Sequence, residues 1–147
     1  MYIDFQIVAV GYAIPEETFF QNVVEKTLTS SKRDFELLIR LVEAAESRHL
    51  NNRYRHRNQP TNVLSFPPSG VEEYLPDYIG DIVMCPSVIE GEACKQSKPI
   101  EAHWAHMTVH GVLHLLGLGH ETEEDALIME DRERRVLSAL RIVDPYQ

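Results

Sequence analysis

We expect this chain to fold as a single α+β domain over residues 1–147, with about five helices packed against a small mixed sheet of about four strands. The length, with 44% hydrophobic and 25% charged residues, is typical of one globular domain with one core. Stretches typical of strands and of helices follow one another without the regular alternation of a doubly wound fold. One predicted helix is apolar on almost every side, which indicates that it is buried.

The first half of the chain combines strand-forming runs with helical patterns. Residues 2–10 are rich in β-branched and aromatic side chains and predict a strand. Pro15 suits the first turn of a helix whose apolar residues recur at helical spacing to about Ser30. Residues 35–42 fit either a strand or a helix, and we favour a strand because residues 43–54 form a separate helical pattern.

The second half of the chain predicts two strands and three helices. Thr122 is placed to cap the last helix, with Asp125 at the acidic position of a capping box. The predicted strands cover residues 61–66 and 78–85, and the predicted helices cover residues 86–96, 100–116 and 122–142.

The overall charge and the cysteines limit the classes of protein to which this chain could belong. A formal net charge of −9 argues, by itself, against a nucleic-acid partner. Cys85 and Cys94 lack the spacing of a CxxC site, so we expect two reduced thiols. The chain shows no signal-peptide pattern and no apolar run of membrane-spanning length. We therefore expect a cytoplasmic protein without a membrane partner.

Three histidines give the strongest chemical signal, because His110, His114 and His120 follow the spacing HxxxHxxGxxH. On a helix the first two lie on one face, about 6 Å apart along the axis. Gly117 readily adopts the left-handed conformation of a helix end, and the turn can bring His120 back toward the other two. Three imidazoles leave a fourth position open on zinc, as in catalytic sites, so we expect one zinc ion per chain.

The predicted buried helix carries its histidines on a single stripe. His103 and His106 share this stripe with His110 and His114, within about 80° on the helical wheel. The stripe must face a cleft or an ion rather than open solvent. Either histidine could support the metal ligands from behind or contact the substrate, and His106, one turn before the expected ligands, is the better candidate.

Gly111 separates this motif from that of zinc peptidases. Their HExxHxxGxxH signature carries a glutamate at this position, which takes the proton from water. The metal-binding spacing is therefore present here without the usual peptidase base.

A basic cluster stands out from the acidic chain at Arg53, Arg55, His56 and Arg57. Guanidinium groups bind phosphates through paired hydrogen bonds. The acidic residues are concentrated elsewhere in the sequence. A metal site combined with arginines therefore suggests a phosphodiester substrate, with Arg55 holding the phosphate and Arg57 as a further contact.

Three motifs, TNVLSFP at 61–67, GDIVMCP at 80–86 and HMTVHGVLHLLGLGH at 106–120, together resemble the YbeY family of bacterial endoribonucleases. The resemblance implies an α+β fold and a zinc ion on His110, His114 and His120, with catalytic roles for His110 and Arg55. It also implies single-strand-directed cleavage of ribosomal RNA, in 3′-end maturation of the small-subunit 16S rRNA and in ribosome quality control, and not of DNA. The family typically has aspartate at the position of Gly119 and glycine at that of His56.

Two alternatives remain open at the level of sequence. One is a zinc hydrolase of peptides or small amides, against which Gly111 argues. The other is a ribosome-assembly factor without catalytic activity, in which zinc is structural. An open fourth coordination position favours catalysis over the second alternative.

Overall fold

The computed structural model describes residues 1–29 and 34–147 and contains a four-stranded mixed sheet with the strand order β1-β2-β4-β3. Strands β1 (Tyr2–Ile7), β2 (Glu36–Leu41) and β4 (Tyr78–Met84) are parallel. Strand β3 (Val63–Phe66) pairs with β4 in the antiparallel direction, with Val63 opposite Met84. The expected α+β class and mixed sheet are thus confirmed.

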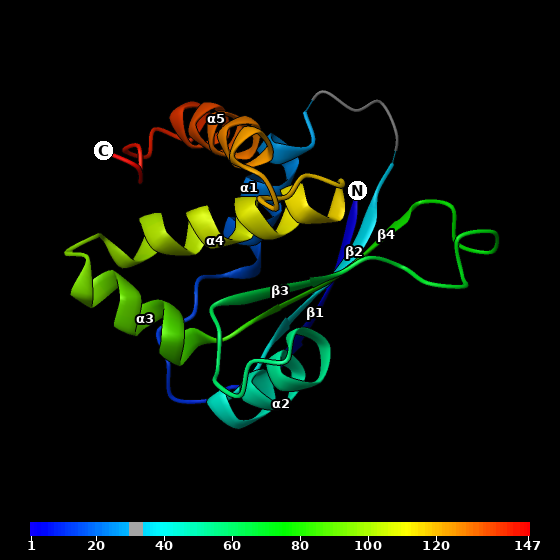
Figure 1. Cartoon of the computed structure of the whole chain (residues 1–147), viewed down its shortest axis with the longest axis horizontal. Coiled ribbons are helices and arrows are strands. Elements are labelled where there is room, and N and C mark those ends of the chain that lie inside the picture. Colours follow the sequence, from blue (N-terminus) through cyan, green and yellow to red (C-terminus); the bar gives the residue numbers. More distant parts are fainter. Residues whose placement is uncertain (30–33) are drawn as a thin grey trace.

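Five helices complete the described fold, and Figure 1 shows α1, α4 and α5 on one face of the sheet and α2 on the other. The side chains of the strands alternate between the two faces, so each face has its own apolar cluster. On the α1 and α4 face, Ile39 and Ile82 pack with Phe20 and Trp104. The helices are α1 (Glu17–Thr27), α2 (Ala44–Arg55), α3 (Pro86–Lys95), α4 (Ile100–Leu115) and α5 (Glu123–Ala139).

The predicted elements are all present, and they differ from the expectations mainly at their ends. Strand β1 ends at Ile7 rather than at residue 10, because the amides of Val8 and Ala9 both donate to the carbonyl of Leu41 and end the regular ladder. Helix α1 ends at Thr27, and the predicted end at Ser30 lies outside the described residues. The ambiguous segment 35–42 contains β2, as favoured.

Two smaller expectations are also confirmed. The hydroxyl of Thr122 accepts a hydrogen bond of 3.1 Å from the amide of Asp125 and caps α5. Both cysteines are free thiols, with Cys85 buried and Cys94 exposed. Among the described residues, no helix is long and apolar enough to cross a membrane.

Candidate active site

Helix α4 holds the first two expected metal ligands in a buried frame. Trp104, Val109, Val112 and Leu113 are at most 1% exposed and fix the helix between the sheet and its neighbouring helices. His110 and His114, four residues apart on this helix, are partly buried. A rigid helix therefore sets the spacing between their two imidazoles.

A Schellman turn at the end of α4 brings the third histidine back. Gly117 has a positive φ of 94°, which strongly favours glycine. The amide of Leu118 donates to the carbonyl of Leu113, and that of Gly117 donates to the carbonyl of His114. This pair of hydrogen bonds defines the motif. The chain reverses at Gly117, as predicted, and His120 returns toward α4.

The three imidazoles converge in a way that could hold a metal ion. The ligand nitrogens of His110, His114 and His120 all lie within 4.8 Å of one another. The Nε2 atoms of His110 and His114 are 3.1 Å apart. Two nitrogens on one tetrahedral zinc, each at about 2.0–2.1 Å, are separated by about 3.4 Å. Both the donor type and the spacing fit a zinc ion.

The environment of His114 favours the neutral imidazole that a metal requires. Burial, followed by the charges of His110, His120 and Arg55, lowers the pKa of His114 to about 4. A neutral ring keeps a lone pair on one nitrogen, and this lone pair is the metal-binding group. At neutral pH protons therefore compete little for this position.

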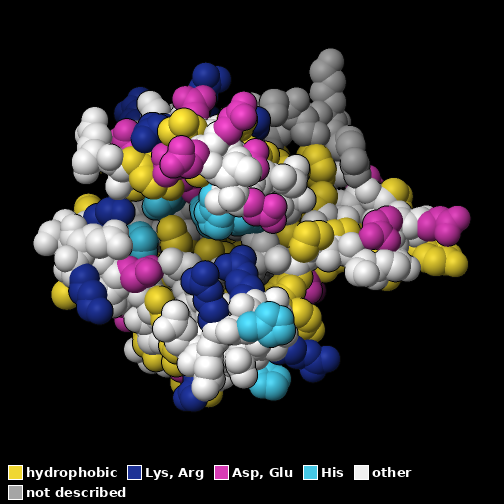
Figure 2. Space-filling model, viewed as in Figure 1, with side chains coloured by type: hydrophobic (Ala, Val, Ile, Leu, Met, Phe, Trp, Pro, Cys, Tyr) yellow, Lys and Arg dark blue, Asp and Glu magenta, His cyan; other side chains and the backbone are white. Residues whose placement is uncertain are grey.

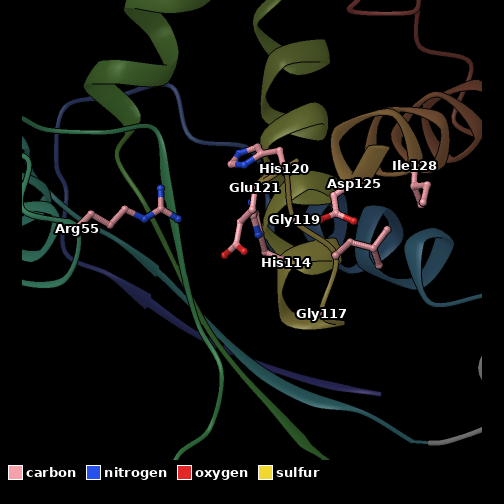
Figure 3. A pocket seen from close by; sticks show the side chains of 9 residues that line it. Arg55, His114, Gly117, Gly119, His120, Glu121, Asp125 and Ile128 are labelled. Atoms are coloured by element: carbon pink, nitrogen blue, oxygen red, sulfur yellow. The ribbon is translucent and has the colours of Figure 1, made fainter. Parts of the chain in front are cut away.

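A pocket of about 540 Å³ opens beside the histidine cluster. Figure 3 shows Arg55 reaching across it from one side, opposite His114, His120 and Glu121. Figure 2 shows histidine side chains gathered near the middle of this face, with Lys and Arg side chains just below them. The lining residues are Arg55, His114, Gly117, Leu118, Gly119, His120, Glu121, Asp125 and Ile128.

Arg55 is the last residue of α2, and a left-handed turn after it ends the helix. His56 has a φ of 58°, a conformation that glycine adopts most readily. His56 thus adopts a backbone conformation that suits glycine. Arg55 is exposed as a residue, but partial burial of its guanidinium and then the charge of Arg57 lower its pKa. An arginine remains charged under all ordinary conditions.

The remaining predicted contacts lie away from this pocket. Arg57 is exposed, close enough to affect the charge of Arg55, and is not among the described residues that line the pocket. His106 is only 8% exposed and contacts Glu133, with 3.4 Å between Nε2 and Oε1. His103 is 3% exposed and lies 3.0 Å from the carboxylate of Glu92. Two histidines of the stripe therefore face buried or partly buried carboxylates rather than the pocket.

Sequence reasoning missed a buried carboxylate behind the cluster. Glu133 is 0% exposed, and its Oε1 lies 2.6 Å from Nδ1 of His110. Burial alone would raise the pKa of Glu133, but hydrogen bonds from His106, His110 and Tyr146 outweigh burial and lower it to about 2. A signal was present in the sequence: Glu133 lies between Met129 and Leu137 on the apolar face of α5, where a charge is unusual.

The acidic residues also lie closer to the arginine than expected from the sequence. Glu121 and Asp125 line the same pocket as Arg55. The Schellman turn places the start of α5 against the histidine cluster, which brings its acidic first turn to the rim. The acidic residues are concentrated elsewhere in the sequence, but the fold brings these two side chains to the pocket that Arg55 lines.

Gly111 faces the sheet rather than the pocket. A Cβ atom at this position would lie 3.1 Å from methyl carbons of both Ile82 and Val63. The carbonyl of Gly111 accepts a hydrogen bond of 2.8 Å from the Ser65 hydroxyl. Glycine thus lets α4 pack closely against β3 and β4, and a side chain at this position would begin against the sheet and crowd Ile82 and Val63.

Comparisons with known proteins identify the family of this chain. A curated Endoribonuclease YbeY from Alkalilimnicola ehrlichii is 48% identical over 146 residues, which cover 96% of this chain and 87% of that protein. A solution structure of a Thermotoga maritima protein shares the fold at 24% identity, with a TM-score of 0.59 and 99% of both chains covered. The family profile of Endoribonuclease YbeY matches residues 12–141. The chain therefore belongs to the YbeY endoribonuclease family.

Proposed function

We propose that residues 1–147 act as one metallohydrolase domain that cleaves single-stranded ribosomal RNA with the help of one zinc ion. The observation that carries this proposal is Arg55 facing the three-histidine cluster across a single pocket. Family membership and the name of the Alkalilimnicola relative support an RNA substrate. The proposed target is the small-subunit 16S rRNA during 3′-end maturation and ribosome quality control, which would place the protein in the cytoplasm.

His110, His114 and His120 would hold the ion. When bound, zinc supplies a Lewis acid that polarises a phosphoryl oxygen and lowers the pKa of water toward about 7. Such chemistry does not depend on a glutamate at position 111, where a side chain would crowd Ile82 and Val63.

Arg55 is the proposed phosphate-binding residue. Its guanidinium projects into the pocket from the end of α2, while the histidines come from α4 and the turn after it. A guanidinium can hold two phosphate oxygens at once, which orients the phosphodiester against the histidine cluster. The same positive charge stabilises the negative charge that develops on the phosphate oxygens during cleavage. Arg57, which is exposed, remains a proposed substrate contact. His106 does not suit that role, because it is 8% exposed, does not line this pocket and faces Glu133.

Replacing Arg55 tests this assignment. We expect Arg55→Ala to reduce cleavage of a single-stranded RNA by about a hundredfold or more, with zinc content unchanged. Arg135→Ala is a matched control, because it removes an exposed arginine from α5 with a side chain 75% exposed. Metal analysis and an RNA cleavage assay measure the two effects. Loss of zinc together with activity would assign Arg55 a structural role instead.

Substrate class needs a separate comparison. We expect the zinc-loaded protein to cleave single-stranded RNA and to leave DNA of the same sequence and casein intact. A chelator should abolish the RNA cleavage, and added zinc should restore it. Cleavage of casein instead of RNA would favour the peptide hydrolase, and His114→Ala supporting normal rRNA maturation in cells would favour a factor without catalytic activity.

A further inference from the structure

A fully buried carboxylate supports the back of the histidine cluster. Glu133 is 0% exposed within the apolar face that α5 turns toward α4, next to Met129 and Leu137. A buried charge is costly unless hydrogen bonds replace the water that it loses. The position therefore requires an explanation beyond packing.

Both oxygens of this carboxylate are occupied by partners from other segments. Oε1 lies 2.6 Å from Nδ1 of His110 and 3.4 Å from Nε2 of His106. Oε2 accepts a hydrogen bond from the hydroxyl of Tyr146. An ionised carboxylate is only an acceptor, so the short contact requires Nδ1 of His110 to carry the proton. The lone pair of that ring is then on Nε2, the atom that lies 3.1 Å from Nε2 of His114.

Tyr146 reaches Glu133 from a segment that is itself held in place. Nε of Arg134 donates to Oδ2 of Asp144 at 3.1 Å, and the Arg134 guanidinium lies 5.1 Å from the centre of the Tyr146 ring. The amide of Tyr146 donates to Oδ1 of Asp144 at 2.8 Å. These contacts fix the hydroxyl toward the buried carboxylate, although the residue as a whole is 40% exposed.

We propose that Glu133 and Tyr146 are positioning residues for the metal site: Glu133 holds the His110 ring with Nε2 directed at the ion, and Tyr146 holds Glu133. The inference rests on the proposed zinc site. In metal centres such a carboxylate behind a histidine fixes its tautomer and orientation, and its loss typically costs about ten- to a hundredfold in metal affinity. Residues 144–146 thus act on a metal ligand without touching the metal.

Zinc affinity, measured by competition with a chromophoric chelator, tests the proposal. We expect Glu133→Gln, which replaces one acceptor oxygen with a donor, to weaken zinc binding by about ten- to a hundredfold. Tyr146→Phe removes only the hydroxyl, and we expect a smaller loss, of about three- to tenfold. Matched controls are Asp131→Asn, in an exposed pair on α5, and Tyr74→Phe, 79% exposed between β3 and β4.

Two further measurements separate positioning from structural support. Thermal unfolding of the metal-free proteins should show that Tyr146→Phe still folds cooperatively, with a stability lowered by the lost hydrogen bond to Glu133. The visible spectrum of bound Co²⁺ should change in both Glu133→Gln and Tyr146→Phe. The proposal would be overturned if both variants bound zinc as tightly as the wild type and gave its Co²⁺ spectrum, whatever their stability. If the wild-type protein and the control variants all failed to bind zinc, the proposed function itself would be overturned. That result differs from failure of the positioning role, in which all of the proteins bind zinc equally.

Discussion

At the scale of single residues, the pocket shows how burial prepares a histidine for a metal. His114 lies between two other imidazoles and opposite a guanidinium, and all of these groups oppose a positive charge on its ring. The folded protein therefore keeps His114 neutral at pH values where an unfolded chain would protonate it.

This difference predicts how the stability of the metal-free protein depends on pH. The folded pKa of His114 is about 4, and the unfolded pKa is 6.5. Between these values the unfolded chain binds more protons, so stability falls as the pH falls. We expect a loss on the order of 1–2 kcal/mol between pH 6.5 and 4, after allowance for solvent screening. Urea unfolding at several pH values should show that the free energy of unfolding depends less steeply on pH in His114→Gln than in the wild type. Equal pH dependence in the two proteins would contradict this role.

Sequence reasoning identified the residues whose role follows from local spacing. The three histidines and Gly117 belong to one motif, and a helix followed by a left-handed turn is enough to bring them together. Glu133 lies 23 positions from His110 and belongs to a different helix, α5. Tyr146 lies 13 positions further on, in a segment with no regular structure. Such long-range contacts depend on the angle between α4 and α5, which spacing does not determine.

At the scale of elements, the end of α4 depends on a glycine in the neighbouring strand. Gly80 in β4 has a φ of 133°, and a Cβ atom there would collide with the carbonyl oxygen of Phe66. The same atom would lie 2.7 Å from Cδ2 of Leu115, the last residue of α4 and the neighbour of His114. The close approach of strand and helix at this point thus supports the position of a metal ligand.

We expect Gly80→Ala to lower the free energy of unfolding by about 2–3 kcal/mol, because of backbone strain and overpacking. The displaced Leu115 should also weaken zinc binding. Gly91→Ala is the matched control, since a Cβ atom in the middle of α3 meets nothing within 4 Å. That substitution should be neutral or stabilise by about 0.5–1 kcal/mol. Chemical unfolding and zinc titration measure both, and equal stabilities would refute the packing argument.

The elements themselves were predictable because their patterns are locally consistent. The period of apolar residues identified the helices, and short β-branched runs identified the strands. Element ends were less predictable, as at Ile7, where a carbonyl of the neighbouring strand accepts two successive amides. These hydrogen bonds depend on the partner strand, so the sequence of residues 8–10 does not indicate where β1 ends.

At the scale of the whole molecule, the pocket joins segments from opposite faces of the sheet. Helix α2 lies on one face and carries Arg55 at its end, while α4 lies on the other and carries the histidines (Figure 1). Parallel pairing of β2 with β4 and antiparallel pairing of β3 with β4 bring these ends together. The sequence suggested that arginine and metal act on one substrate, but only this strand order explains how they meet.

The distribution of charge predicts a weak dependence of RNA binding on salt. The net charge is −9, and the dense basic cluster contains Arg53, Arg55 and Arg57. Single-stranded binding that neutralises about two or three phosphates gives a slope of about −1.5 to −2 for log K against log salt. Fluorescence anisotropy measures this slope for Arg55→Ala, which we expect not to cleave the RNA, and for the wild-type protein with a chelator. The two slopes should differ by about 0.7. A slope near −5 would indicate a larger basic surface.

The Schellman turn after α4 has a consequence for how this site can vary between proteins. Neither Gly117 nor Gly119 has an atom within 4 Å of the place a Cβ would occupy, so the rim of the pocket is shaped by backbone geometry rather than by packing. Substitutions on the rim that preserve the turn can change the character of the entrance without disturbing the core beneath α4. Gly119 meets this condition, because a side chain there finds open space, whereas the positive φ of Gly117 makes any other residue at that position strained.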